Sequence, residues 1–403
     1  MSLLKISDRA IALDVSANLV ISTKVRELKK QGVSVVSLYS GEPNFETPKA
    51  IIDAAKEALS KEAVNKYTPI RGTDELVQSI QAKFKNTLGL NYDSRQIIAS
   101  TGVKGSLSLA LDVLINPGDE IILLAPYWAT YLAQVKFAGG VPVVVSGKIE
   151  NRYVPSIEDF KRALSSKTKA ILINTPNNPA GYVMSENYLS QIMRFLESTS
   201  VCVISDEIYE YLLFHNLKHI SPATLSENAY KRTLVLIGVA KAYAMTGWRV
   251  GVAAGPKELI AAMVKLQGQR YSCITSIAQS VAGFAFREST PIKEAMINIK
   301  KEYCSRCDFL EKIIATLPQI SWSKPQGAFF ALLDFSALIG KEHRGCELKN
   351  DIDLANRLLI EAHVAVVPGS QFGIPNTVRI SLSSSLKNIK EGLKRIIKWI
   401  DLF

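Results

Sequence analysis

The chain has 403 residues, more than one hydrophobic core normally supports, and this length predicts about two or three domains. Hydrophobic residues make up 47% and charged residues 21%, as in an ordinary globular protein, and no stretch approaches the roughly 18 apolar residues of a membrane span. The net charge of +11 is spread along the chain without a basic tail or a basic stripe interleaved with aromatic residues. The charge therefore favours anionic small molecules, and we expect no nucleic acid and no membrane as partners.

The five cysteines are an odd and scattered set, and the N-terminus has no apolar core followed by a cleavage site. Both features predict a reduced, cytoplasmic protein. Cys304 and Cys307 form a C-x-x-C, but they lie in an amphipathic run over about 293–316 that predicts a helix, and no second pair stands near enough to complete a zinc site. We expect no metal, because none of the four histidines belongs to a metal-binding motif: His215, His219, His343 and His363.

The N-terminal part predicts helices with one strand between them. Periodic apolar residues predict a helix over 16–31, and VSVVSLY (33–39) predicts a strand that ends in a turn over 40–44. A helix is expected from Thr47-Pro48 to about residue 60, with the proline in its first turn, and another over 74–88.

From about residue 96 the pattern changes to short apolar runs that alternate with helical stretches. Such runs predict a mostly parallel sheet covered by helices on both faces, which is an α/β fold. Ligands of such sheets bind beyond the carboxyl ends of the strands, so the polar residues there are candidates. The strand-like runs are QIIAS, EIILLAP, VPVVVS, AILINTP, VCVISDE and TLVLIGV.

The stretch 234–254 carries Lys241 just after a buried strand. A lysine in this place is costly unless it is paired or used, and one use is a Schiff base with a carbonyl compound such as pyridoxal phosphate. Arg249, between two glycines, offers a planar bidentate partner for a phosphate. The alternative is a loop with two surface cations, and this stretch alone does not decide between the two.

Candidates also follow the first strands of the sheet. Gly102 and Val103 begin a helix whose free N–H groups suit a phosphate. The positive charge of Lys104 is unfavourable at this end of the helix dipole, and a bound anion would relieve the conflict. An exposed lysine in a common strand–helix turn is the alternative. Trp128 can either stack on a planar ring or cover the core.

Two later strand ends complete the set. Asn178 lies in a rigid loop rich in proline and asparagine. Asp206 ends a buried strand and needs a partner, for which a protonated pyridine nitrogen and a helix N-terminus are the two alternatives. Tyr209 can reach the same ring. Together the candidates fit a phosphorylated pyridine aldehyde.

The chain resembles the class I aminotransferases of the aspartate aminotransferase type, which are fold-type I pyridoxal-phosphate enzymes, and most closely their bacterial subgroup. The resemblance implies a seven-stranded, mostly parallel sheet between helices in a large cofactor-binding domain over 47–285. It also implies a smaller α+β domain formed by the N-terminal segment 1–46 and the C-terminal part 286–403. The resemblance begins at about Asp8, runs to the C-terminus and rests on SGEPNFETP, NTPNNPAGYV, SDEIYE, GVAKAYAMTGWRVG, KPQGAFF, VVPGSQFG and VRISLS.

The resemblance assigns the catalytic and ring-binding roles. Lys241 is then the Schiff-base lysine, present as an internal aldimine, and afterwards the proton shuttle. Asp206 pairs with the pyridine nitrogen. Tyr209 and Asn178 hydrogen-bond the ring oxygen, and Trp128 stacks on the ring.

The phosphate, by the same resemblance, lies against Arg249 and the backbone of Gly102 and Val103. Tyr67 reaches the phosphate in the neighbouring subunit, which implies a homodimer with shared active sites.

Substrate binding follows the family pattern too. Arg379 in VRIS binds the substrate α-carboxylate, helped by the backbone at Gly41, and Trp128 and Asn178 also line the substrate. The turn GVKGSL resembles GGKQAL of the bacterial subgroup, which makes Lys104 the reader of the distal carboxylate of aspartate or glutamate.

The chain departs from the family pattern at two positions. Ala240 precedes the lysine where many members have a serine that touches the phosphate, although some bacterial aspartate aminotransferases also have alanine. Asn18, in Ser16-Ala17-Asn18, stands where a threonine accompanies prephenate use, and so weighs against prephenate.

The sequence thus predicts a pyridoxal-phosphate aminotransferase that exchanges amino groups between L-aspartate and 2-oxoglutarate by a ping-pong mechanism. The alternatives are another amino donor (alanine, aromatic or methionine), prephenate, or carbon–sulfur cleavage with the same cofactor. A regulator with an idle aminotransferase-like domain and a DNA-binding module is a further alternative, which we do not expect because the family pattern begins almost at once.

Overall fold

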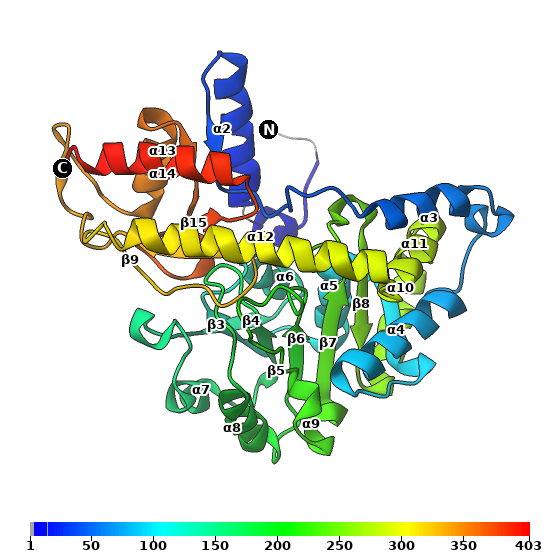
Figure 1. Cartoon of the computed structure of the whole chain (residues 1–403). Coiled ribbons are helices and arrows are strands. Elements are labelled where there is room, and N and C mark those ends of the chain that lie inside the picture. The colour runs from blue at the N-terminus through cyan, green and yellow to red at the C-terminus, as the bar shows by residue number, and fades with distance from the viewer. Residues whose placement is uncertain (1–3, 14) are drawn as a thin grey trace.

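A seven-stranded sheet lies at the centre of the molecule, in the order β2-β8-β7-β6-β5-β3-β4 (Figure 1). The computed structural model describes residues 4–13 and 15–403. Strand β8 runs antiparallel to both of its neighbours, and all other neighbouring strands are parallel, which confirms the predicted sheet. The strands are β2 (Ile97–Thr101), β3 (Glu120–Ala125), β4 (Val141–Ser146), β5 (Thr168–Asn174), β6 (Cys202–Asp206), β7 (Thr233–Gly238) and β8 (Val250–Ala254).

Helices cover both faces of this sheet because alternate strand residues point to opposite sides. Ile121 and Leu123 of β3 pack with α5, α6 and α10, whereas Ile122 and Leu124 pack with α7 and α8 on the other face. Helices α3, α4 and α11 cover the same sheet near β2, β7 and β8. The helices are α3 (Lys49–Leu59), α4 (Asp74–Leu88), α5 (Gly102–Leu114), α6 (Ala129–Phe137), α7 (Ile157–Ala163), α8 (Glu186–Leu196), α9 (Glu227–Arg232), α10 (Lys257–Arg270) and α11 (Ser276–Phe286).

Segments from both ends of the chain pack together above the central sheet (Figure 1). Strand β1 (Val36–Ser37) pairs in parallel with β13 (Val364–Ala365), and a four-stranded sheet has the order β14-β15-β10-β9. The long helix α12 (Thr290–Ile314) crosses the molecule between these parts. The remaining elements are α1 (Asp8–Ile11), α2 (Ala17–Lys30), β9 (Ser321–Trp322), β10 (Phe330–Asp334), β11 (Glu342–His343), β12 (Cys346–Glu347), α13 (Asp351–Glu361), β14 (Val367–Pro368), β15 (Thr377–Ser381) and α14 (Leu386–Ile400).

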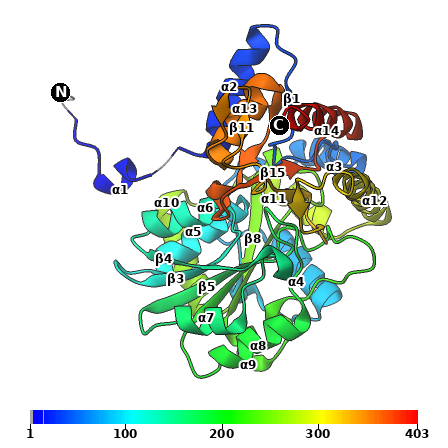
Figure 2. The ribbon, with the colours of Figure 1, turned by 90° about the vertical axis from the view of Figure 1, so that its left-hand side faces the viewer.

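The N-terminal segment leaves the body of the molecule. Figure 2 shows α1 standing away from the rest of the chain, on the side of α5, α6 and α10. Arg9 of α1 contacts the body of the molecule, with its guanidinium 5.2 Å from the ring centre of Phe137. Across the residues that the structure describes, no helix is long and apolar enough to cross a membrane.

The structure corrects the predicted elements in three places. The strand expected over 33–39 is only two residues long, because its partner β13 is equally short. Pro48 is the N-cap of α3 rather than a first-turn residue. Strand β8 was not predicted. Its residues are mostly small and follow directly on the segment with Lys241 and Arg249, so they did not stand out as a separate apolar run. The expected helix around Cys304 and Cys307 is confirmed as α12.

Candidate active site

A cavity of about 380 Å³ lies beyond the carboxyl ends of the central strands. It is lined by all the predicted site residues except Tyr67, which therefore come together although they lie far apart in the sequence. The lining members of that set are Gly41, Gly102, Val103, Lys104, Trp128, Asn178, Asp206, Tyr209, Lys241, Arg249 and Arg379.

The β7–β8 pair brings Lys241 and Arg249 to the same cavity. Gly238 at the end of β7 stands opposite Gly251 of β8, and the connection between the two strands carries both cations. A Cβ added to Gly251 would overlap the backbone of Gly102 and Val103. The absence of a side chain at Gly251 therefore lets β8 lie directly against the N-terminus of α5.

Lys241 is partly buried, and its amine donates a 2.6 Å hydrogen bond to the carbonyl oxygen of Gly41. Burial lowers the pKa of Lys241 to about 8, and the nearby guanidinium groups of Arg379 and Arg249 act in the same direction. A large part of the amine is therefore neutral near pH 8, and the neutral form is the nucleophile.

Asp206 is the last residue of β6 and is 2% exposed. Burial raises the pKa of its carboxyl to about 6, against the hydrogen bonds it accepts from the Tyr131 hydroxyl (2.7 Å) and the Ile208 N–H (3.2 Å). Turns rather than a helix follow β6, so the alternative that Asp206 caps a helix is wrong. A buried carboxylate that lines a cavity suits a cationic partner such as a protonated ring nitrogen.

One end of the cavity has the features of an anion site. Gly102 has a φ of +69°, and a Cβ added to it would lie 2.5 Å from Nη2 of Arg249. The Arg249 guanidinium thus lies against the first turn of α5, where free N–H groups and the helix dipole favour negative charge. Its Nη1 donates to the Thr246 carbonyl oxygen at 2.9 Å. A phosphate fits this end.

Arg379 of β15 is 1% exposed. Its Nη1 donates to Asn178 Oδ1 at 3.0 Å and its Nη2 to the Tyr39 carbonyl oxygen at 2.7 Å, while Nε has no hydrogen-bond partner within residues 4–13 and 15–403. Among the described residues no carboxylate pairs with it. A buried guanidinium without a counter-ion suits an anionic ligand.

Lys104 stands in the first turn of α5, exposed at the rim of the cavity. Its amine lies 4.9 Å from the centre of the Trp128 ring. Although Lys104 is exposed, desolvation by the surrounding lining and the charge of Arg249 lower the pKa of its amine. Lys104, Arg249, Lys241 and Arg379 make the lining strongly positive, and a ligand with more than one negative charge would relieve their mutual repulsion.

Tyr67 lies outside the cavity and is 91% exposed. Its predicted contact with a neighbouring subunit stays a prediction.

Several lining residues were not among the predicted candidates. Tyr131 holds the Asp206 carboxylate, and the Thr246 hydroxyl donates to Glu42 at 2.6 Å. Asn174 ends β5 and donates to the Asp206 carbonyl oxygen at 2.9 Å. The position of Asn174 at a strand end could have identified it, whereas nothing local to Tyr131 indicates its partner.

The lining fits a planar, phosphorylated ring with an aldehyde. An anion cradle lies at one end, Trp128 can cover a ring face, Asp206 suits a ring nitrogen, and the Lys241 amine can react with a carbonyl carbon.

Comparison with known proteins points the same way. The family described as "Aminotransferase class I and II" matches residues 33–396. An aspartate aminotransferase of Bacillus subtilis (strain 168) is 39% identical over 99% of each chain, and an aspartate/prephenate aminotransferase of Thermus thermophilus is 36% identical over 98% of each chain.

Solved structures agree with these relatives. The aspartate aminotransferase of Rhizobium meliloti superposes with a TM-score of 0.94 at 33% identity, over 99% of each chain. The aspartate aminotransferase of Thermus thermophilus with maleate gives a TM-score of 0.92 at 36% identity, over 98% of this chain and 100% of the other. The match across the chain, the fold and the cavity lead to one conclusion: this protein belongs to the class I and II aminotransferase family.

Proposed function

We propose that this aminotransferase depends on pyridoxal 5'-phosphate and exchanges the amino group between L-aspartate and 2-oxoglutarate. The observation that carries the proposal is the cavity in which Lys241, with its lowered pKa, shares one lining with Asp206 and Arg249. Lys104 and Arg379 add two further cations for a substrate with two carboxylates. The names of the relatives, aspartate aminotransferase in Bacillus subtilis among them, support the same substrate.

In this proposal the residues divide into cofactor-binding and catalytic groups. Bound pyridoxal phosphate supplies an electron-poor ring that accepts electrons from the carbon bearing the amino group. Arg249 and the N–H groups at Gly102 and Val103 bind its phosphate, and Asp206 keeps the ring nitrogen protonated. The Lys241 amine would hold the cofactor's aldehyde carbon covalently, with loss of water. Once the amine of the substrate has displaced it, the free Lys241 amine would carry a proton to and from the reacting carbon.

Other groups hold the ring in position. We propose that the Trp128 ring lies over one face, and that Tyr209 and Asn178 hydrogen-bond the ring oxygen. Asn178 also accepts a hydrogen bond from Arg379 (3.0 Å), which links the ring to the substrate end of the cavity.

In this proposal Arg379 and Lys104 select the substrate. Arg379 binds the α-carboxylate through two parallel N–H groups, next to the backbone at Gly41. Lys104 binds the distal carboxylate. Maleate, which is present in a solved Thermus thermophilus relative, is also a dicarboxylate and supports this division.

Prephenate is the second candidate substrate, because relatives in Aquifex aeolicus and Thermus thermophilus are named for aspartate and prephenate together. Asn18 lines the cavity, and its side-chain oxygen is buried without a hydrogen-bond partner among the residues that the structure describes. This amide would have to accommodate the larger substrate, so we rank prephenate below aspartate. Another amino donor or carbon–sulfur cleavage remains an alternative with the same cofactor.

We also propose a homodimer with shared active sites, in which Tyr67 reaches the phosphate bound by the partner. Its 91% exposure supports this role, since a large aromatic side chain at the surface is available to a second chain. The five cysteines are free, which supports a reducing, cytoplasmic compartment.

The proposed domains are a large cofactor-binding domain over 47–285 and a small domain from 1–46 and 286–403. The support is one hydrophobic cluster that joins Val36 and Leu38 to residues of β10, β15 and α14. Arg379 belongs to the small domain, so closure of this domain over a substrate would exclude water from the proton-transfer step.

The test is one half-reaction of the purified protein. L-aspartate alone should convert the visible absorption of the bound cofactor to that of its amino form at concentrations at which L-alanine does not. A better conversion by alanine or an aromatic donor would overturn the substrate assignment. A protein that stays colourless after the cofactor is added would overturn the role of Lys241.

Lys104→Gln tests the distal contact. Hydrogen bonds to charged groups contribute about 1.5–3 kcal/mol, so kcat/KM for aspartate should fall by about 10- to 100-fold while the value for alanine changes little. Lys136→Gln removes an exposed lysine from nearby α6 and is the matched control. Equal losses for aspartate and alanine would contradict the assignment.

A further inference from the structure

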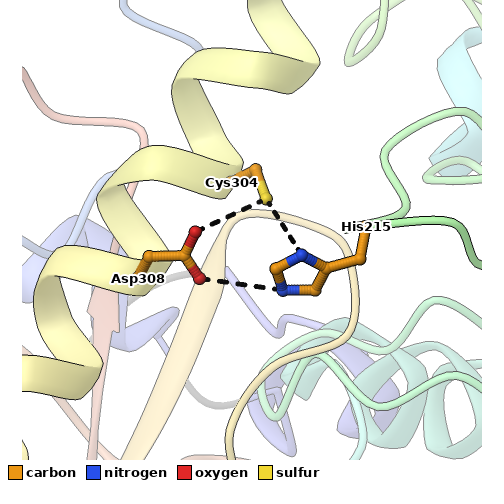
Figure 3. Close-up of side chains that lie close together, drawn as sticks. All are labelled: His215, Cys304 and Asp308. Atoms are coloured by element: carbon orange, nitrogen blue, oxygen red, sulfur yellow. Dashed lines mark hydrogen bonds and ion pairs between the residues drawn. The ribbon is translucent and has the colours of Figure 1, made fainter.

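A second group of reactive side chains lies outside the active-site cavity. Cys304 and Asp308 stand four residues apart on one face of α12, and His215 comes from the segment that follows β6 (Figure 3). One ligand atom from each of the three residues lies within 4.8 Å of the others.

The two distances from Cys304 Sγ are close to those around a tetrahedral metal ion. Cys304 Sγ lies 3.8 Å from His215 Nδ1 and 3.9 Å from Asp308 Oδ2. With Zn–S bonds of about 2.3 Å and Zn–N or Zn–O bonds of about 2.1 Å, a tetrahedral ion separates the same atoms by about 3.6 Å. The two distances from Sγ therefore differ from this geometry by a few tenths of an ångström. The Asp308 carboxylate also faces the other ring nitrogen of His215, with Oδ1 3.7 Å from Nε2, so a side-chain rotation has to bring one ring nitrogen and one carboxylate oxygen onto the same ion.

The backbone holds His215 in this place. Phe214, its neighbour, is fully buried in the cluster that also contains Cys307 of α12, and its N–H donates to the Gln326 carbonyl oxygen at 2.8 Å. Leu213 forms a β-bridge with Gly327. The histidine and the helix are thus already packed against each other, and little order has to be gained on binding.

The surroundings leave room for an ion. The side chains of His215 and Asp308 are 54% and 42% exposed, so a cation and a water ligand can enter from solvent. Lys324 pairs with Oδ1 of Asp308 at 3.3 Å and with Glu311 at 2.8 Å, which leaves Oδ2 to face Cys304. This lysine opposes a bound cation, so its removal should strengthen binding.

We infer that His215, Cys304 and Asp308 bind a soft divalent cation such as Zn²⁺ and so tie α12 to the segment that carries Tyr209. A thiolate, an imidazole and a carboxylate are all common zinc ligands, and three protein ligands plus water complete a tetrahedron. The sequence led us to expect no metal, because the C-x-x-C has no second pair; the histidine stands 89 residues from Cys304 in the chain.

The experiment is a calorimetric titration of the holoenzyme with Zn²⁺. One Zn²⁺ ion per chain should bind. Cys304→Ser and His215→Asn should each lower the Zn²⁺ affinity by at least about 100-fold, since loss of a residue that only hydrogen-bonds to a metal ligand already lowers affinity by about 10- to 100-fold. Cys346→Ser removes an exposed cysteine elsewhere and should leave binding unchanged. Lys324→Gln should increase the Zn²⁺ affinity, because it removes a positive charge next to Asp308.

A second measurement identifies the ligands directly. Cobalt(II) in place of zinc should give a thiolate-to-metal absorption band in the wild type and in Cys346→Ser but not in Cys304→Ser. Zn²⁺ should also raise the unfolding temperature of the wild type and leave that of Cys304→Ser unchanged. Binding that survives Cys304→Ser, or no saturable binding by the folded wild type, would overturn the proposal.

Discussion

At the scale of single residues, the chemistry of Lys241 depends on groups that lie far from it in the chain. Burial and the charges of Arg379 and Arg249 lower the pKa of the amine, whereas Asp206 opposes them. Arg379 comes from β15, far along the chain from the connection that carries Lys241, and both residues line the cavity. The tuning of this amine is therefore a property of the assembled site.

The apoprotein should capture pyridoxal phosphate at a rate that rises with pH and levels off above about pH 8. Only the neutral amine attacks the aldehyde, and the amine is neutral above its pKa. Arg379→Gln removes a positive charge and should move the midpoint to higher pH. Stopped-flow absorbance at a series of pH values around 8 measures the rate of capture and its midpoint. Arg95→Gln, remote and exposed, serves as the control, and an unchanged midpoint in Arg379→Gln would contradict the expectation.

Tyr131 should affect cofactor affinity through its hydrogen bond to Asp206. Tyr131→Phe removes the 2.7 Å hydrogen bond to the carboxylate, which raises the pKa of Asp206 further and weakens its hold on a cationic ring. At about 1.5–3 kcal/mol for such a bond, cofactor affinity should fall by about 10-fold or more.

The matched control is Tyr188→Phe, because the Tyr188 hydroxyl is buried and, in the described part of the chain, has no hydrogen-bond partner. Cofactor dissociation, followed by dialysis and absorbance, distinguishes the two variants. Equal affinities in both variants would show that the bond to Asp206 has no effect on the cofactor.

At the scale of elements, the contact between β8 and the start of α5 positions the anion site. A side chain at Gly251 would overlap the backbone of Gly102 and Val103, so these two elements are as close as their main chains allow. The same contact brings Arg249, one residue before β8, to the N-terminus of α5.

Gly251→Ala should separate these elements. Overpacking of this kind costs about 1–3 kcal/mol of unfolding free energy, and the displaced helix N-terminus should weaken binding of inorganic phosphate and of the cofactor. Gly247→Ala lies in the same connection, where an added Cβ meets no atom within 4 Å, and it should leave both properties near the wild type. Thermal unfolding and phosphate titration are the measurements. Normal phosphate affinity in Gly251→Ala would argue against this arrangement of the anion site.

The strands of the central sheet were predictable because they are buried on both faces and therefore read as continuous apolar runs. The two-residue length of strands β1, β13 and β14 was not predictable from the sequence, since it depends on how far their partners extend. Strand β8 was missed for a related reason. The residues of β8, Val-Gly-Val-Ala-Ala, are small because α5 packs closely against this strand. Such small residues have no strong preference for extended structure, so the sequence pattern does not indicate a strand.

At the scale of the whole molecule, the proposed dimer makes a prediction about mixed subunits. Lys241→Ala and Tyr67→Ala each damage the site, but a hybrid dimer of the two has one site with both residues intact. A one-to-one mixture should thus recover about a quarter of the wild-type activity, because about half of the dimers are hybrids and one of their two sites is intact.

The activity of the mixture is compared with that of each variant alone after subunit exchange, and sedimentation gives the assembly state. A mixture of Lys241→Ala with the wild type is the control for the effect of mixing, and it should keep about half of the wild-type activity with or without exchange. Activity no higher than the average of the two variants would contradict a shared site.

The sequence by itself determined which chemical groups this protein has and where they stand relative to the strands. Apolar runs marked the sheet, and polar residues at the strand ends marked the site, because burial and the period of each element are local properties of the chain. The tertiary structure decided the pKa of Lys241, the bond between Tyr131 and Asp206, and the meeting of His215 with Cys304. These depend on distances between residues far apart in the chain, and electrostatic and coordination energies change steeply with such distances in a partly buried site.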